Sequence, residues 1–404
     1  MGLKNLFSSK KKKKLRPTNL EGWLEASIAN ILEPEDFAKN QVFINNISDP
    51  LSKVSTVLCF LAFQDKNKFI AGGYRTILAV NNAISQKFSA KIYFCFFPAQ
   101  KNKDRISEYQ SAMAEHFPNM NYEIVSYEDA FNLDADIAIC NFWLGAYPLL
   151  KFNNCKRKYY LVQDYETVFY PSGTASCLAE LSYTFGFHKL TNSQALKKRL
   201  EAIDSMSPIH RYYPGIDHSL YYPIKNKSFI KDKYKIIFYG RPKNSRNAFT
   251  LLSQAFIKLK DIVGDKIEII SVGENYDVKD YNLEGIVTNL GCFNSLSELA
   301  DLYRECDIGL SFITTPTFSY QHMEFMASGL CLVTNEQDGI MDMFTDNENA
   351  VICKPVASIV AKRIADLINH PENMKNISCK GQEFTSKLDW NKCFDGICDF
   401  ILKN

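Results

Sequence analysis

The sequence lacks long apolar runs, closely spaced cysteine pairs and histidine clusters. No apolar run in the 404 residues approaches the roughly 20 that a membrane-spanning helix needs. The basic N-terminus has no apolar core behind it, so we expect no secretory signal. The twelve cysteines include no C-x-x-C pair, and most fall in apolar, strand-like runs, which favours reduced thiols in a cytosolic protein over disulfides. The six histidines form no H-E-x-x-H motif and pair with no cysteine, so we expect no bound metal.

Basic residues outnumber acidic ones only because of the N-terminal tail. Lys4, Lys10–Lys14 and Arg16 supply seven of the 47 basic residues, and no acidic residue precedes Glu21. The remaining chain has 40 basic and 45 acidic residues, a formal charge of −5. The lysine run fits an anionic membrane surface, a nucleic acid or no partner at all, as a solvated tail. Because positive charge is confined to the tail, we expect no nucleic-acid partner.

Residues 1–50 are predicted to hold this tail and one amphipathic helix, ahead of a chain of ordinary globular composition. The helix ends before Pro34, and its apolar face suits either a membrane surface or the following domain. That face consists of Leu20, Trp23, Leu24, Ile28, Ile31 and Leu32. We expect a cytoplasmic protein, with Lys10–Lys14 as a candidate contact to the inner face of the cytoplasmic membrane.

The stretch from Asp307 to Asn335 is predicted to form a parallel β–α–β unit. Ile308–Ile313 and Leu330–Val333 have the pattern of buried strands, with a polar loop and a short helical pattern between them. Gly329 stands where a left-handed cap would end that helix. In such a unit the loop and the helix N-terminus lie at the carboxyl ends of the strands, where open α/β sheets bind ligands. Free N–H groups there favour an anion, although an αβ unit without a ligand has the same pattern.

Apolar runs alternate with helical patterns over most of the remaining chain, which predicts parallel sheets. The further strand-like runs are Val54–Phe63, Ile92–Phe97, Tyr122–Val125, Ile137–Cys140, Ile236–Tyr239, Ile267–Val272, Val287–Leu290 and Val351–Lys354. The length suggests two or three domains. We therefore predict an α/β fold built from doubly wound sheets.

Two glycine-containing loops follow predicted strands and open helices. Arg241 and Arg246 lie just after Gly240, where a planar guanidinium suits a diphosphate. Gly72 and Gly73 precede a helical pattern, and paired glycines let a ligand approach the backbone, although glycine also marks plain turns.

Carboxylates occur in two further motifs. Asp164 and Glu166 follow a predicted strand, so one of them could orient or deprotonate an acceptor hydroxyl, unless both are solvated loop groups. Asp134 and Asp136 have the D-x-D spacing of metal-dependent sugar transferases. This pair precedes its strand, at the amino edge of the sheet, so we exclude it from the ligand site.

Several of these motifs resemble those of family 4 glycosyltransferases. Glu324-Phe-Met-Ala-Ser-Gly329 is similar to the E-x-M-A-x-G element of that family, and Pro214-Gly-Ile-Asp217 is similar to its interdomain turn. Pro316-Thr-Phe-Ser-Tyr320 resembles the P-x-x-S-Y loop of the narrower WsaF-type rhamnosyltransferases, as do the G-G-x-R-T and Q-D-x-E runs. Pro316 occupies the place of another glutamate in the general family, which puts that carboxylate's contacts with sugar hydroxyls in doubt.

The resemblance implies a GT-B fold, with two doubly wound Rossmann-like domains facing across a cleft. The implied parts are an acceptor-binding domain (51–218), a nucleotide-sugar-binding domain (219–385) and a C-terminal helix (386–404) that crosses back to the first domain. The implied activity is retaining, metal-independent transfer of L-rhamnose from dTDP-L-rhamnose to a saccharide or lipid-linked saccharide in bacterial surface-glycan synthesis. In the family's proposed chemistry, the departing phosphate takes the acceptor proton on the same face of the sugar.

The resemblance and the motifs together assign residues to three roles. The predicted catalytic residues are Asp164, Arg241 and Arg246; the donor-binding residues are Gly72, Gly73, Arg241, Arg246, Ser319, Tyr320 and Glu324; the acceptor-binding residues are Trp143, Tyr147 and Glu166. Three alternatives stay open: a non-catalytic sugar-nucleotide-binding or scaffold protein, a transferase that uses a UDP- or GDP-sugar, and a sugar-nucleotide epimerase of similar shape.

Overall fold

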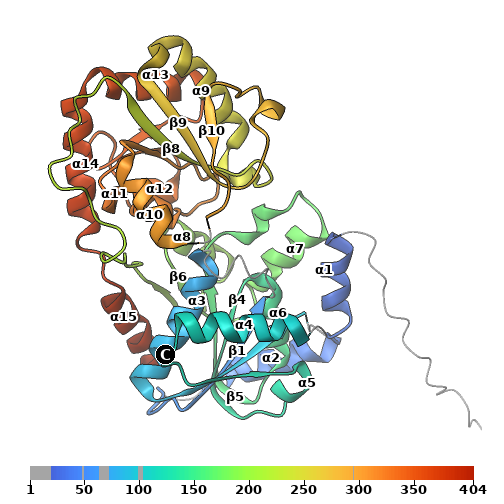
Figure 1. The fold of residues 1–404 in the computed structure, drawn as a ribbon. Helices are drawn as coiled ribbons and strands as arrows, with labels where there is room; N and C mark the ends of the chain where they lie inside the picture. The colour runs from blue at the N-terminus through green and yellow to red at the C-terminus, as the bar shows by residue number, and fades with distance from the viewer. Residues whose placement is uncertain (1–19, 48–49, 63–71, 99–102, 294) are drawn as a thin grey trace, which may run out of the picture.

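The chain folds into two lobes, each built on a parallel sheet with helices on both faces (Figure 1). The computed structural model describes residues 20–47, 50–62, 72–98, 103–293 and 295–404. In Figure 1 the first domain is the lower lobe and the second domain is the upper one. This is the two-domain α/β architecture predicted from the alternation of apolar runs.

The first domain is organised around a seven-stranded sheet of order β3-β2-β1-β4-β5-β6-β7. Its strands are β1 (Thr56–Ala62), β2 (Lys91–Phe97), β3 (Tyr122–Val125), β4 (Ala135–Asn141), β5 (Cys155–Val162), β6 (His188–Thr191) and β7 (Ile209–Arg211). Every strand pair is parallel. The strand order reverses between β1 and β4, and open sheets bind ligands outside the carboxyl ends of the strands at such a reversal.

The helices of the first domain cover both faces of this sheet. They are α1 (Leu20–Ala29), α2 (Pro34–Asn45), α3 (Gly72–Phe88), α4 (Lys103–His116), α5 (Tyr127–Ala130), α6 (Trp143–Lys151), α7 (Thr174–Ser182) and α8 (Gln194–Ile203), with the 3₁₀ helix η2 (Glu166–Phe169). In α1, Ile28 is buried in a core cluster, and Ile31 and Leu32 pack against the same cluster. The end of this helix therefore packs on the first domain, which was one of its two predicted positions.

The second domain has a six-stranded parallel sheet of order β10-β9-β8-β11-β12-β13. Its strands are β8 (Tyr234–Gly240), β9 (Ile267–Gly273), β10 (Val287–Asn289), β11 (Ile308–Leu310), β12 (Cys331–Asn335) and β13 (Val351–Cys353). Its helices are α9 (Phe249–Val263), α10 (Leu296–Glu305), α11 (Tyr320–Ala327), α12 (Asp338–Met341), α13 (Ala357–Asn369) and α14 (Pro371–Thr385), with η3 (Ser245–Asn247), η4 (Gly264–Lys266) and η5 (Val278–Tyr281). The strand order reverses between β8 and β11, so these two strands deliver their following loops to one place.

The last helix, α15 (Trp390–Lys403), crosses back to the first domain, as predicted (Figure 1). Its buried face, including Ile397 and Ile401, belongs to the same core cluster as β1 and α3. Lys87 of α3 forms an ion pair with Asp395 at 2.7 Å. The Tyr159 hydroxyl donates to the Ile401 carbonyl at 3.1 Å. The helix therefore ties the end of the second domain to the first.

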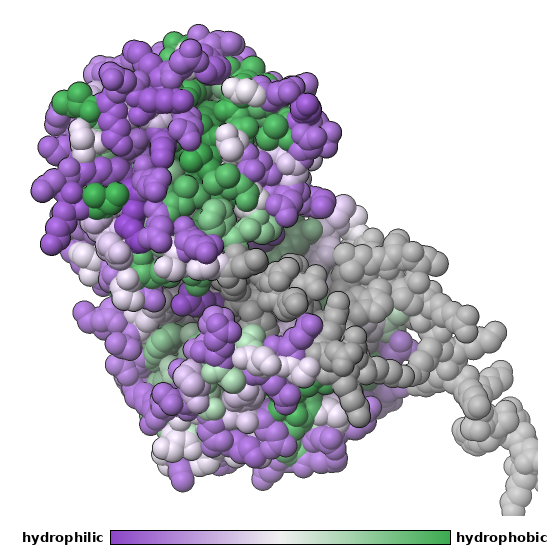
Figure 2. Space-filling view, viewed as in Figure 1, coloured by the Kyte–Doolittle hydropathy of each residue, from purple (hydrophilic) through white to green (hydrophobic). Residues whose placement is uncertain are grey.

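The described part of the chain contains no helix both long and apolar enough to cross a membrane. On the face shown in Figure 2, hydrophilic residues cover most of the periphery of both lobes, and hydrophobic residues form a band on the upper lobe. Lys10–Lys14 lie outside the described residues, so their contact with an anionic membrane surface stays a prediction.

Candidate active site

The β11–α11–β12 unit has the predicted form, with a shorter first strand. β11 ends at Leu310; the Ser311 N–H still donates to the Val333 carbonyl at 3.2 Å, and the buried residues after Ser311 leave the sheet ladder. The Asn335 side chain takes the place of a neighbouring strand there, because it accepts from the Ile313 N–H at 2.7 Å and donates to the Ile313 carbonyl at 2.9 Å. Gly329 has a φ of +85° just after α11. The loop 311–319 and the start of α11 thus lie at the carboxyl edge of the second sheet.

A neutral histidine fixes the start of α11. The His322 Nδ1 atom accepts from the Ser319 N–H at 3.1 Å, and its Nε2 atom lies 2.7 Å from the Ser311 carbonyl. Burial lowers the pKa of His322 to about 4, so the ring is neutral and Nε2–H donates to that carbonyl. Ser319, one of the predicted donor-binding residues, is also the N-cap of the helix.

Tyr320, the first residue of α11, packs closely against the first domain. A Cβ atom at Gly72 would lie 2.5 Å from Cδ2 of the Tyr320 ring, so only glycine allows this approach. The Tyr320 hydroxyl is hydrogen-bonded to the Thr76 hydroxyl at 3.0 Å. Gln163 donates to the Gly73 carbonyl at 2.7 Å, and its side-chain oxygen accepts from Tyr320 at 3.4 Å. Three of the predicted motifs, the G-G-x-R-T run, the Q-D-x-E run and the P-x-x-S-Y loop, therefore meet at one point.

Replacing Gly72 by alanine is expected to lower the melting temperature by a few degrees, because the added methyl must displace the Tyr320 ring. Gly73→Ala is the matched control, since its Cβ would meet no atom closer than the Gln163 Nε2 at 3.6 Å, an ordinary contact. Thermal unfolding of both variants measures the difference. Equal melting temperatures would show that Gly72 is not needed for the contact with Tyr320.

Asp164 and Arg246 form an ion pair across the cleft. The Arg246 Nη1 atom lies 2.6 Å from the Asp164 Oδ2 atom, and the guanidinium stacks over the Phe169 ring at 4.1 Å. Burial raises the pKa of the Asp164 carboxyl, and the positive charge of Arg246 opposes that rise. Both residues were predicted to be catalytic, and the structure brings them into direct contact.

Arg241 has no such carboxylate partner among the residues that the structure describes. Its guanidinium lies 5.2 Å from the centre of the Tyr239 ring, at the end of β8. Lys243, two residues on, pairs instead with Glu274 at 3.4 Å and is 86% exposed. An unpaired guanidinium at the carboxyl edge of a sheet is available to bind a phosphate.

Glu324 lies one turn into α11 and carries a carboxylate with an unusual proton affinity. Burial raises its pKa to about 7, while the Tyr221 hydroxyl and the positive charge of Arg75 lower it. The Tyr221 hydroxyl itself has no hydrogen-bond partner among the described residues. Arg75 comes from α3 of the first domain, so the carboxylate is influenced from across the cleft.

The predicted acceptor-binding residues are all buried. The Glu166 carboxylate accepts from the Trp143 N–H at 2.6 Å and the Tyr160 hydroxyl at 3.0 Å, and burial raises its pKa to about 8. The Trp143 indole donates to Tyr170, and Tyr147 donates to the Leu178 carbonyl. These side chains support the loop after β5, and their contact with an acceptor stays a prediction.

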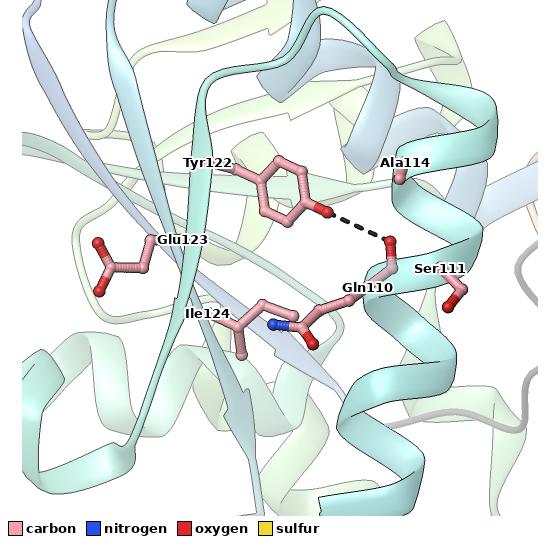
Figure 3. A pocket seen from close by; sticks show the side chains of 6 residues that line it. All are labelled: Gln110, Ser111, Ala114, Tyr122, Glu123 and Ile124. Carbon is pink, nitrogen blue, oxygen red and sulfur yellow. Dashed lines mark hydrogen bonds between the residues drawn. The ribbon is translucent and has the colours of Figure 1, made fainter.

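Two other features lie away from the domain junction. Asp136 accepts from the backbone N–H groups of Ser55 and Thr56 at the start of β1, and pairs with Lys156. Figure 3 shows a shallow pocket between α4 and the edge strand β3, lined by Gln110, Ser111, Ala114, Tyr122, Glu123 and Ile124. Its one carboxylate, on Glu123, points away from the other side chains and pairs with Lys91. Neither place offers the charges that a sugar nucleotide needs.

The sequence analysis did not identify several residues that lie where the two domains are in contact. Thr317 donates to the Gln163 carbonyl at 3.2 Å, and the Pro316 carbonyl accepts from Ser193 at 3.2 Å. Pro316, which stands in place of the family's glutamate, thus contacts the first domain. Arg75 was visible only as a member of the G-G-x-R-T run, and Tyr221 was not singled out. Nothing in their spacing could indicate that both approach Glu324, because that proximity depends on how the domains pack.

The amino-acid sequence of this chain is similar to one protein-family model and to known proteins. Residues 234–365 match the family model described as WsaF, C-terminal domain. The O-antigen biosynthesis protein RfbC of Myxococcus xanthus is 32% identical over 276 residues, which are 68% of this chain and 21% of that protein. The chain therefore spans about one fifth of the length of RfbC.

Solved structures share the fold at low sequence identity. HepE of Anabaena, in complex with UDP and glucose, superposes with a TM-score of 0.65 at 15% identity, over 85% of this chain and 99% of that one. TarM superposes with a TM-score of 0.67 at 11% identity, over 87% of this chain and 99% of that one. The second domain of this chain is similar to the WsaF C-terminal domain, and the chain as a whole has the two-domain GT-B fold.

Proposed function

We propose that this chain is a retaining glycosyltransferase that moves a sugar from a nucleotide donor to a saccharide acceptor in bacterial surface-glycan synthesis. One observation carries the proposal: Arg241, Arg246 and the start of α11 lie at the carboxyl edge of the second sheet, opposite Asp164 and Gly72. A diphosphate in this place would meet two guanidinium groups and the positive end of the α11 helix dipole. The acceptor would approach from the first domain.

Each charged group has a role in the proposed reaction. Arg241 and Arg246 hold the diphosphate and stabilise its growing charge while the bond to the anomeric carbon breaks. The backbone amide of Tyr320 adds a hydrogen bond to it, whereas the Ser319 amide already donates to His322. The departing phosphate takes the proton of the acceptor hydroxyl on the same face of the sugar, and Asp164 orients that hydroxyl. With this charge supplied by arginines, we propose that no metal is required.

We propose dTDP-L-rhamnose as the donor. The match to the WsaF C-terminal domain supports this choice, and Pro316 in place of a carboxylate suits a deoxy sugar with one fewer hydroxyl to bind. HepE, crystallised with UDP and glucose, supports a UDP-sugar as the alternative. A thermal-shift screen over dTDP-, UDP- and GDP-sugars tests the proposal, since a ligand that binds the native state raises its melting temperature. No shift with any of them would overturn it.

A non-catalytic binding protein is the second candidate, and the ion pair between Asp164 and Arg246 favours it. In that arrangement each group neutralises the other, and neither is free for a substrate. The two candidates separate in a transfer assay with polysaccharide fragments. Binding of a nucleotide sugar without transfer to any fragment of a broad acceptor panel would favour the binding protein.

Donor affinity is expected to fall about tenfold for each pH unit below the pKa of Glu324, which burial raises to about 7. We propose that the carboxylate accepts hydrogen bonds from the ribose hydroxyls, which only its ionised form can do fully. The ionised form dominates above that pKa and is lost as the pH falls through it. Calorimetric titration of the donor across this range measures the effect.

Glu324→Gln is the control for this titration, because an amide does not change its charge over the same range. The variant should bind the donor more weakly at high pH and show no loss of affinity between high and low pH. A pH dependence that survives in Glu324→Gln would assign it to another group, such as Glu166, whose pKa burial raises to about 8.

A further inference from the structure

Arg75 is an exposed arginine in the first turn of α3, and the proposed reaction gives it no role. Two contacts fix this turn against the first turn of α11: Gly72 lies under the Tyr320 ring, and Thr76 is hydrogen-bonded to the Tyr320 hydroxyl at 3.0 Å. Glu324 follows Tyr320 by one helical turn. The same packing holds the first turn of α3 against the first turn of α11, and the Arg75 charge acts on the Glu324 carboxyl.

Three polar groups from three parts of the fold influence one another at this place. Arg75 comes from α3, Glu324 from α11, and Tyr221 from the linker between the two sheets. Arg75 makes no ion pair with the described residues, yet its charge reaches both of the others and lowers the pKa of each. Tyr221 is only 3% exposed, and its hydroxyl lacks a hydrogen-bond partner among the described residues. A buried hydroxyl without a partner is costly, which suggests that a ligand completes it.

The other neighbours of Glu324 do not replace Arg75. Tyr303 of α10 also faces the carboxylate, but it is fully buried and donates no positive charge. Its hydroxyl accepts from Gln321 at 3.1 Å. Arg75 is thus the cation that opposes the cost of burying the Glu324 charge, and it belongs to the opposite domain.

We propose that Arg75 is a positioning residue for the nucleotide sugar: it places a cation beside Glu324 from across the cleft, and so couples recognition of the donor's hydroxyl pair to closure of the two domains. This inference rests on the proposed function. When the domains are apart, Arg75 moves away with α3, and Glu324 loses the charge that keeps it ionised. The hydroxyl pair of the nucleotide sugar then meets a weaker hydrogen-bond acceptor at Glu324. Tyr221, whose hydroxyl also lowers the pKa of Glu324, adds a polar group at the same place.

The test compares Arg75→Gln, which removes the charge at similar length, with Arg75→Lys, which keeps it. Calorimetry with dTDP-L-rhamnose and UDP-glucose gives the dissociation constants of the intact protein and both variants. For whichever probe the intact protein binds, Arg75→Gln is expected to weaken binding about fivefold, the upper range for a partly exposed charge pair. Arg75→Lys should stay close to the intact protein. Because Arg75 is exposed, both variants should keep the melting temperature of the intact protein.

A double variant separates action through Glu324 from direct contact with the donor. If Arg75 acts through Glu324, Arg75→Gln combined with Glu324→Gln should bind no more weakly than Glu324→Gln alone. In addition, Arg75→Gln should move the loss of donor affinity to higher pH, since the carboxylate is then harder to ionise. A merely structural role of Arg75 would not move this pH profile.

The possible results distinguish failure of the role proposed for Arg75 from failure of the proposed glycosyltransferase function. If the losses of donor affinity caused by Arg75→Gln and Glu324→Gln are fully additive in the double variant, the role of Arg75 is overturned and the transferase proposal stays intact. The same holds if the pH profile of donor affinity is unchanged in Arg75→Gln. Unchanged affinity in Arg75→Gln would do the same. If the intact protein binds neither probe, nor any sugar nucleotide of the thermal-shift screen, the proposed function and this inference fail together.

Discussion

Replacing Arg241 by alanine is expected to lower the rate of sugar transfer by about a hundredfold or more, which is the usual effect of removing one donor that stabilises a developing negative charge. The Arg241 guanidinium lies at the end of β8 and makes no ion pair with the described residues, so no other protein group neutralises it. Its charge would act on the diphosphate as the glycosidic bond breaks. Steady-state kinetics with a saturating donor measures the loss in kcat.

Lys243→Ala provides the matched control for Arg241→Ala. Lys243 lies in the same loop and has the same charge, but it is 86% exposed and pairs with Glu274. A screened surface pair contributes little, so this variant should keep near-normal transfer. Near-normal turnover in Arg241→Ala itself would remove Arg241 from the site, and equal losses in the two variants would point to the net charge of the loop.

The elements of the second domain could be predicted because their signals are local. A buried strand, a polar loop, a helical pattern and Gly329 follow one another within a single stretch, and the structure has them in that order. The terminal helix was equally clear, since its apolar residues recur at helical spacing. The prediction extended the strand after Asp307 too far, to Ile313. Burial continues to that residue, but the Asn335 side chain replaces the sheet ladder there.

The contacts between the domains could not be predicted, because they join residues far apart in the chain. No local pattern indicates that the Tyr320 ring lies on Gly72, or that Arg246 reaches Asp164. The aromatic residues after β4 show the limit of local patterns in another way. Trp143 and Tyr147 follow a strand at the ligand edge, which suggested an acceptor surface; both are buried and hydrogen-bonded to Tyr170 and to the Leu178 carbonyl of α7, so their contact with an acceptor stays a prediction. Position at a sheet edge does not determine whether a side chain faces the cleft.

The ion pair between Asp164 and Arg246 links the two halves of the proposed reaction. In the proposed reaction the diphosphate needs Arg246 and the acceptor hydroxyl needs Asp164, yet these two side chains are paired with each other at 2.6 Å. A donor that binds Arg246 must first compete with the Asp164 carboxylate. Once the diphosphate has taken the guanidinium, Asp164 becomes free to accept a hydrogen bond from the acceptor. The pair therefore favours binding of the donor before the acceptor.

Asp164→Asn is accordingly expected to have opposite effects on the two steps. The amide keeps the shape of the side chain but releases Arg246, so donor affinity should rise, while transfer should fall about a hundredfold or more because the group that orients the hydroxyl is lost. Calorimetry and steady-state kinetics measure the two changes separately. Glu180→Gln is the control, since Glu180 accepts from the Tyr165 hydroxyl next to Asp164 and should affect neither step. Weaker donor binding together with unchanged transfer would mean that Asp164 serves only to hold Arg246 in place.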